Sequence, residues 1–193
     1  MKRFIFSLTL ITSLFAFSSS SSLAHTQLNQ FFLKNTIQSI NPFDVINWTL
    51  GDKMEYQISA AFGNIGTMEK EVTEDNADTL WLTQSTKLMN QNDIVEILLN
   101  KADGKVLKII RNGKEERIPE SDLEIIDQDY TTVTVPAGTF ESLHVTANTK
   151  DVSNLEVWIN PDATVMDGVL KNVIPTNMLT LTMELTAFKH GKP

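Results

Sequence analysis

The sequence predicts a mainly β protein of the α+β class, with one large curved antiparallel sheet or half-barrel of about nine or ten strands and one N-terminal helix. Three observations predict this fold. Residues 53–60 and 179–187 alternate between apolar and polar side chains, which is the period of a half-buried antiparallel strand. The dipeptides Asp-Gly at 103–104 and Asn-Gly at 112–113 favour tight hairpins, and each lies between apolar segments. No alternation of helices with strands follows, so a parallel sheet is not expected.

The N-terminus has the three parts of a secretory signal peptide. Lys2 and Arg3 are followed by an almost wholly apolar run at 4–17 and by small residues within 22–24 that suit a cleavage site. The apolar run is shorter than the roughly 20 residues that a membrane-spanning helix needs. We therefore expect export, with no membrane span left after processing.

Cleavage would divide the chain into a signal peptide at 1–24 and a single β-rich domain at 25–193. The expected location is the periplasm or the extracellular space. The chain has no cysteine, so the domain must be held together by its core rather than by disulfides. The net charge is −8 for the full chain, and cleavage removes two basic and no acidic residues. Such an acidic surface repels nucleic acid, so no nucleic-acid partner is expected.

A helix is expected over residues 26–40, directly after the cleavage point. Its apolar residues recur at nearly helical spacing, and Asn41 with Pro42 ends the pattern. These apolar residues are Leu28, Phe31, Phe32, Ile37 and Ile40.

The strands are expected to follow one another along the rest of the chain. Turn residues at 136–138 and 160–162 separate several of them. The expected strands lie near 53–60, 65–73, 78–86, 93–99, 105–111, 114–118, 130–135, 140–147, 154–159 and 179–187.

Some of these strands are apolar on both faces, which is the main indication of a binding function. A large twisted sheet must cover its apolar face, and one helix can cover only part of it. We therefore expect a lipid, a lipoprotein or an envelope partner to be held on the concave face. Core packing is the alternative explanation of the same residues. The candidate ligand-binding residues are Trp81, Leu98, Ile110 and Trp158.

Residues 130–188 resemble a pattern found in uncharacterised secreted bacterial proteins. The pattern is a Val-Pro-Ala-Gly-x-Phe motif at 135–140, then the segment "LEVWINPDATVMDGVLK", and then a closing strand "MELTAF". Such proteins resemble the half-barrel superfamily of periplasmic lipoprotein carriers, whose incomplete barrel holds acyl chains. The resemblance implies a half-barrel fold and a carrier-like function.

A copper site is the alternative that the histidines suggest. Cleavage would leave His25 with a free α-amino group, and an amine beside an imidazole suits Cu(II). His144 or His190 would have to supply the second imidazole, and His144 lies on the more polar side of its strand. An accidental terminal histidine is the other interpretation, and we expect no metal or other cofactor.

Residues 115–129 are rich in carboxylates, but they lack the spacing of a calcium-binding loop. A solvated edge that discourages aggregation is the simpler interpretation. The chain also lacks the usual markers of nucleophilic, zinc and nucleotide chemistry, although a pair of glycosidase carboxylates has no sequence marker. We therefore expect a non-enzymatic binding protein, or alternatively a structural module that docks onto an envelope assembly by an edge strand or a surface patch.

Overall fold

The computed structural model describes residue 46 and residues 48–119, 123–150, 152–176 and 179–192. The expected signal peptide, the expected helix at 26–40 and His25 lie outside the described residues.

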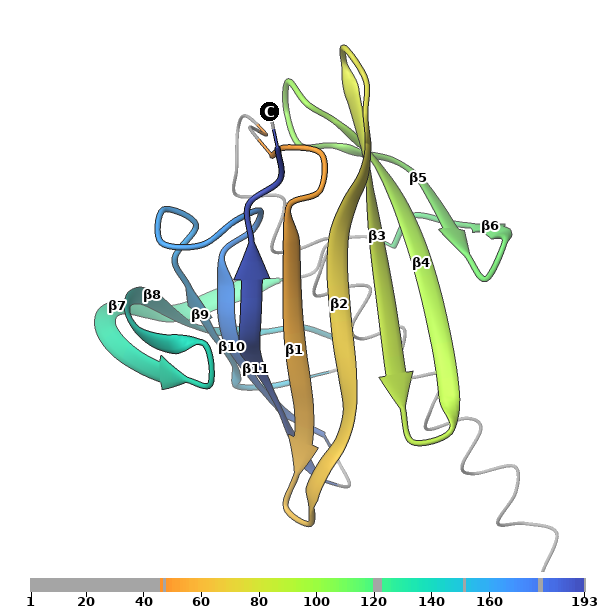
Figure 1. Ribbon diagram of the computed structural model, residues 1–193. Coiled ribbons are helices and arrows are strands. Elements are labelled where there is room, and N and C mark those ends of the chain that lie inside the picture. Colours follow the sequence, from red (N-terminus) through yellow and green to blue (C-terminus); the bar gives the residue numbers. More distant parts are fainter. Residues whose placement is uncertain (1–45, 47, 120–122, 151, 177–178, 193) are drawn as a thin grey trace, which may run out of the picture.

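The described chain forms one antiparallel sheet of eleven strands, which curves without closing (Figure 1). The strands lie in the order β6-β5-β4-β3-β2-β1-β11-β10-β9-β8-β7. The first and last strands, β1 and β11, are therefore neighbours in the middle, and each half of the sheet is a run of consecutive strands. The strands are β1 Lys53–Ala60, β2 Gly63–Asp75, β3 Thr79–Leu88, β4 Gln91–Asn100, β5 Val106–Arg111, β6 Lys114–Glu116, β7 Glu124–Val135, β8 Gly138–Asn148, β9 Leu155–Ile159, β10 Val169–Pro175 and β11 Thr180–Lys189.

The predicted mainly β fold with one large curved antiparallel sheet is confirmed, but the expected number of strands was too low. Strand β10 was missed because its sequence, "VLKNVIP", places Asn172 among the buried positions and breaks the apolar alternation. Strand β7 begins at Glu124 rather than near residue 130, because its acidic first half was interpreted only as a solvated edge. The expected hairpin at 112–113 is present, and Asn112 and Gly113 both have the positive φ angles (49° and 77°) that a type I′ turn needs.

The hydrophobic core lies on one face of the sheet, here called the inner face. Alternate side chains along the central strands are almost completely buried there, as in Met54, Tyr56 and Ile58 of β1. The core also includes Ile46 and Trp48, which precede β1. Further core residues are Met68, Val72, Leu80, Leu82, Ile97, Leu99, Ile109, Leu155, Leu170, Ile174, Leu181, Met183 and Leu185.

The β7–β8 hairpin folds against the middle of the sheet. The backbone N–H of Ala137, in its turn, donates to the carbonyl oxygen of Leu185 in β11 at 3.0 Å. Val133 and Val135 are buried in the core, and the Phe140 ring contacts Phe188 of β11 edge to face, with centroids 6.4 Å apart. These contacts hold the hairpin, which forms one edge of the sheet, against β11 in the middle of the sheet.

The loop between β9 and β10 also packs on the inner face. Its residues 164–168 are buried, and they include the core residues Val165 and Met166. The loop is braced by its own bonds, because the N–H of Asn160 donates to the carbonyl of Gly168 at 2.8 Å and the hydroxyl of Thr164 donates to the carbonyl of Asn160 at 2.9 Å. The chain therefore fills part of the curve of its sheet with its own loop.

Candidate functional site

A buried ion pair joins this loop to the sheet. Lys70 of β2 points from the inner face, and its Nζ lies 2.6 Å from Oδ2 of Asp167. The two side chains are 2% and 1% exposed. Their positions, 97 residues apart in sequence, connect the two halves of the sheet. Removing two charges from water costs several kcal/mol per ion, so this pair must be kept together once it is buried.

Tyr56 of β1 lies beside the ion pair. Its ring is 5.7 Å from Nζ of Lys70, and its hydroxyl donates to the carbonyl of Val169 at 3.0 Å. Burial, and next the charge of Asp167, raise the pKa of the Tyr56 phenol well above its usual value of about 10. The phenol therefore stays protonated and keeps its hydrogen bond.

Replacing Tyr56 by Phe removes this hydrogen bond and is expected to lower the free energy of unfolding by about 1–3 kcal/mol, because the Val169 carbonyl loses a buried donor. The effect depends on pH. Above about pH 10 the phenol ionises in the unfolded chain but not in the folded one, so the folded wild type binds more protons and loses stability as the pH rises. The difference between wild type and variant should therefore shrink in urea unfolding curves measured above about pH 10.

Tyr130→Phe is the matched control, because that ring is 86% exposed. It should leave the free energy of unfolding at neutral pH unchanged. A difference between wild type and Tyr56→Phe that grows with pH would contradict the buried, protonated phenol.

A second charged pair on the inner face lies near the β5–β6 hairpin. Nε of Arg111 is 3.2 Å from Oδ2 of Asp93, and the other oxygen of Asp93 accepts from the Asn112 amide at 2.9 Å. Nη1 of Arg111 lies 3.5 Å from Glu116. These contacts hold the hairpin turn in place.

Three of the four candidate ligand-binding residues, Trp81, Leu98 and Ile110, lie on the outer face of the sheet, opposite the core, whereas Trp158 packs against the core. Trp81 of β3 is directly across from Leu98 of β4, and Ile110 of β5 is paired with Glu96, so it is a diagonal neighbour of Leu98. The structure therefore brings three of the four residues together. Trp158 lies apart from them, on β9.

The placement on the concave face was wrong for Trp81, Leu98 and Ile110. Leu80 and Leu82 beside Trp81, and Ile97 and Leu99 beside Leu98, are the side chains that fill the inner face. Where both faces of a strand are apolar, alternation alone does not tell which face is buried.

Ile94 extends this group and was not predicted as a site residue. It is 46% exposed and shares the outer side of β4 with Glu96 and Leu98. The alternation of β4 was the signal that could have identified it. We call Trp81, Ile94, Leu98 and Ile110 the outer patch.

Trp158 packs against the core and belongs to a row of paired residues across the other half of the sheet. Its ring stacks on His144 at 4.3 Å, and Nζ of Lys171 lies 5.7 Å from it. His144 also contacts Asp129 at 3.0 Å, and Lys171 contacts Glu184 at 3.0 Å. With a neighbour over the ring on each strand beside it, Trp158 works as a cross-strand packing residue of the sheet.

The described part of the chain provides no arranged group of metal ligands for the alternative copper site. The Nδ1 of His144 faces Asp129, and its Nε2 is 3.7 Å from Glu156. Among the described residues, no group of three or more His, Asp or Glu side chains is arranged to hold a metal ion. His25 lies outside the described residues.

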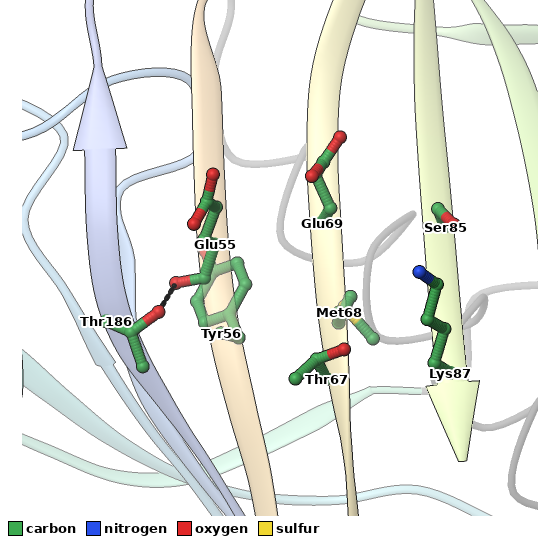
Figure 2. A pocket seen from close by; sticks show the side chains of 8 residues that line it. All are labelled: Glu55, Tyr56, Thr67, Met68, Glu69, Ser85, Lys87 and Thr186. Carbon is green, nitrogen blue, oxygen red and sulfur yellow. Dashed lines mark hydrogen bonds between the residues drawn. The ribbon is translucent and has the colours of Figure 1, made fainter.

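A shallow depression of about 330 Å³ lies on the outer face over β1, β2, β3 and β11 (Figure 2). Figure 2 shows polar side chains around it, with the hydroxyl of Thr186 donating to the carbonyl of Glu55 at 3.0 Å. Lys53 bridges Glu69 and Glu55 at 2.9 and 3.0 Å, and these hydrogen bonds raise the pKa of its ammonium group. The depression is lined by Glu55, Tyr56, Thr67, Met68, Glu69, Ser85, Lys87 and Thr186. Such a polar, open hollow does not suit an acyl chain, which binds in apolar, enclosing sites.

No protein-family model matches the chain, and no curated protein sequence matches it significantly. Three solved structures are similar in shape. A hypothetical protein from Chlamydia trachomatis aligns at 10% identity and a TM-score of 0.49, over 75% of this chain and 89% of its own. A proposed exported protein with a YmcC-like fold from Bacteroides fragilis aligns at 10% identity and a TM-score of 0.41, over 75% and 98%. A proposed lipoprotein from Parabacteroides distasonis aligns at 13% identity and a TM-score of 0.36, over 75% and 97%.

These likenesses are too distant to transfer a function to this chain. The fold and the surfaces define a curved, open β-sheet protein whose inner face is packed with its own side chains. In the described part of the chain, no helix has the length and apolar character of a membrane span.

Proposed function

We propose that this chain is an exported, non-enzymatic binding protein of the cell envelope that binds a partner protein through the outer patch. The observation that carries the proposal is the contrast between the two faces. The inner face is packed by core residues and by the loop at 164–168, whereas the outer patch places apolar side chains on three adjacent strands where the sheet has no second layer described over it.

A protein surface is a better fit to the outer patch than a lipid. Trp81, Leu98 and Ile110 lie on a continuous sheet surface, and a sheet surface of mixed apolar and charged residues is typical of a protein interface. Glu96 and Lys108 lie between these apolar residues and would give the interface its polar contacts. An acyl chain instead needs walls around it. The lipid-carrier function implied by the resemblance to lipoprotein carriers stays a prediction.

The export part of the proposal comes from residues 1–24, with their basic start, apolar run and small residues. The absence of the common catalytic motifs supports a non-enzymatic protein.

Site-specific photo-crosslinking in cells tests the proposal. A photoreactive phenylalanine analogue placed at Leu98 or at Ile110 should give the same single adduct with one envelope protein, because the two positions lie on one patch. Trp81→Glu should reduce the yield of that adduct about tenfold, since a charge in the centre of an apolar interface costs more than 1.4 kcal/mol.

Phe62 is the matched control position, because it is 69% exposed in the turn between β1 and β2. The analogue at Phe62 should give no adduct with that partner. The proposal fails if positions 98 and 110 give no adduct or give the same adducts as position 62. Native mass spectrometry of the exported protein examines the lipid alternative: a bound lipid that survives Trp81→Glu would favour the carrier function over the outer patch.

A further inference from the structure

The two edges of the sheet differ sharply. β6 has only three residues, and all three are charged, which is a common protection against strand addition. β7 has twelve residues and is the last strand of the sheet, beside β8 (Figure 1). Among the described residues, no backbone hydrogen bond joins β7 to a strand other than β8. Within the described residues, one edge is therefore blunted, and the other is long and unpaired.

The open edge also concentrates exposed apolar side chains. Ile125, Ile126 and Tyr130 of β7 are 56%, 53% and 86% exposed. No other strand carries three exposed large apolar residues in the described part of the chain. An exposed, long strand with such residues is a template for pairing with another strand.

The β7 edge is ordered by its pairing with β8. From Asp127 to Val135 each residue of β7 pairs in register with β8. The Thr132 hydroxyl donates to Glu141 at 2.9 Å, and the Ser142 hydroxyl donates to the Thr131 carbonyl at 2.9 Å. A partner strand would therefore lose little free energy in ordering the edge it binds.

The charge of the edge determines what can pair with it. The exposed half of β7 carries Glu124, Asp127 and Asp129, and it has no lysine or arginine. A second copy of β7 would place carboxylates opposite carboxylates, which is destabilising. A strand in which Lys or Arg alternates with apolar residues would place opposite charges together and cover Ile125 and Tyr130.

We propose that the edge of β7 binds an extended segment of another protein, basic and apolar in alternation, as an added antiparallel or parallel strand. This site is separate from the outer patch, since β7 lies at the opposite end of the sheet from β5. It is a second binding surface, and it adds to the function proposed above.

The test uses the purified processed protein and a fluorescent peptide in which Lys alternates with Val. Fluorescence anisotropy should show saturable binding that weakens as salt is added. Methylating alternate backbone nitrogens of the peptide keeps its side chains but removes strand hydrogen bonds, and it should weaken binding at least about tenfold, or 1.4 kcal/mol. Equal binding of the methylated peptide would overturn the proposal.

Charge exchange then locates the site. Glu124→Lys with Asp127→Lys should weaken the Lys–Val peptide about tenfold and allow a Glu–Val peptide to bind. The control, Glu74→Lys with Asp78→Lys, makes the same change of net charge on exposed residues away from β7 and should leave the binding unchanged. Equal losses in the two variants would show non-specific attraction and reject the site.

Two further outcomes separate this proposal from its rivals. A dimer in sedimentation velocity that Tyr130→Lys dissociates would make a second copy the occupant and overturn the basic segment. Trp81→Glu should leave peptide binding unchanged, so that failure of the outer patch and failure of the β7 edge are observed independently.

Discussion

Lys70→Met is expected to lower the free energy of unfolding by about 3–5 kcal/mol, the usual cost of leaving one member of a buried ion pair without its opposite charge. Met fills a similar volume, so the effect reports the charge rather than a cavity. The Asp167 carboxylate would stay 1% exposed, without the ammonium group that now lies 2.6 Å away. Urea unfolding followed by tryptophan fluorescence measures the change.

The double variant Lys70→Met with Asp167→Leu separates the charge from the packing. Replacing both members of a buried pair by apolar residues is often neutral or stabilising, so the double variant should recover most of the loss. If the double variant is as unstable as the sum of two damaging single variants, the ion pair is not the cause. A Lys70→Met protein with wild-type stability would show that the pair is open to water.

Gly168→Ala is expected to destabilise the protein by about 2–5 kcal/mol. Gly168 has a φ of +66°, and a Cβ there would lie 2.2 Å from the backbone nitrogen of Pro161. The added Cβ would collide with backbone atoms at the start of the same loop, and these atoms, unlike a side chain, cannot rotate away. A backbone movement that relieved this clash would also displace Asp167 and disturb its contact with Lys70. Thermal and urea unfolding measure the loss.

Gly113→Ala is the matched control for the backbone term. Gly113 has a φ of +77°, and nothing lies within 4 Å of the position its Cβ would take. This variant should lose only the roughly 1–2 kcal/mol that a left-handed conformation costs an L-residue. Equal losses in the two variants would mean that the close approach at Gly168 is relieved at no cost.

Local sequence patterns were enough to predict the class of fold. Period-two alternation and the Asn-Gly turn are read from neighbouring residues, and both are present in the structure. Strand β10 was not predicted because Lys171 and Asn172 interrupt its apolar pattern, and both residues are placed by pairing with β9 and β11 rather than by their immediate neighbours. A pairing partner of this kind is not visible from neighbouring residues alone.

The sites were harder to predict than the fold. The positions of Met68, Lys70 and Val72 at every second residue place the lysine on the apolar face, so its burial could have been inferred. Its partner Asp167 lies in an irregular loop, where no period indicates direction. For Trp81 and Leu98 the sequence identified strands that are apolar on both faces, but it did not show that the two residues pair or which face is packed as the core.

The strand order has a consequence for how the chain folds. Within each half of the sheet, every strand pairs with the one before or after it, so those contacts are local and close quickly. Segments from opposite ends of the chain meet where β1 pairs with β11, through the Lys70–Asp167 ion pair and through the hydrogen bond from Tyr56 to Val169. We therefore expect two meanders to form early and independently, and their union along this central seam to limit the rate of folding.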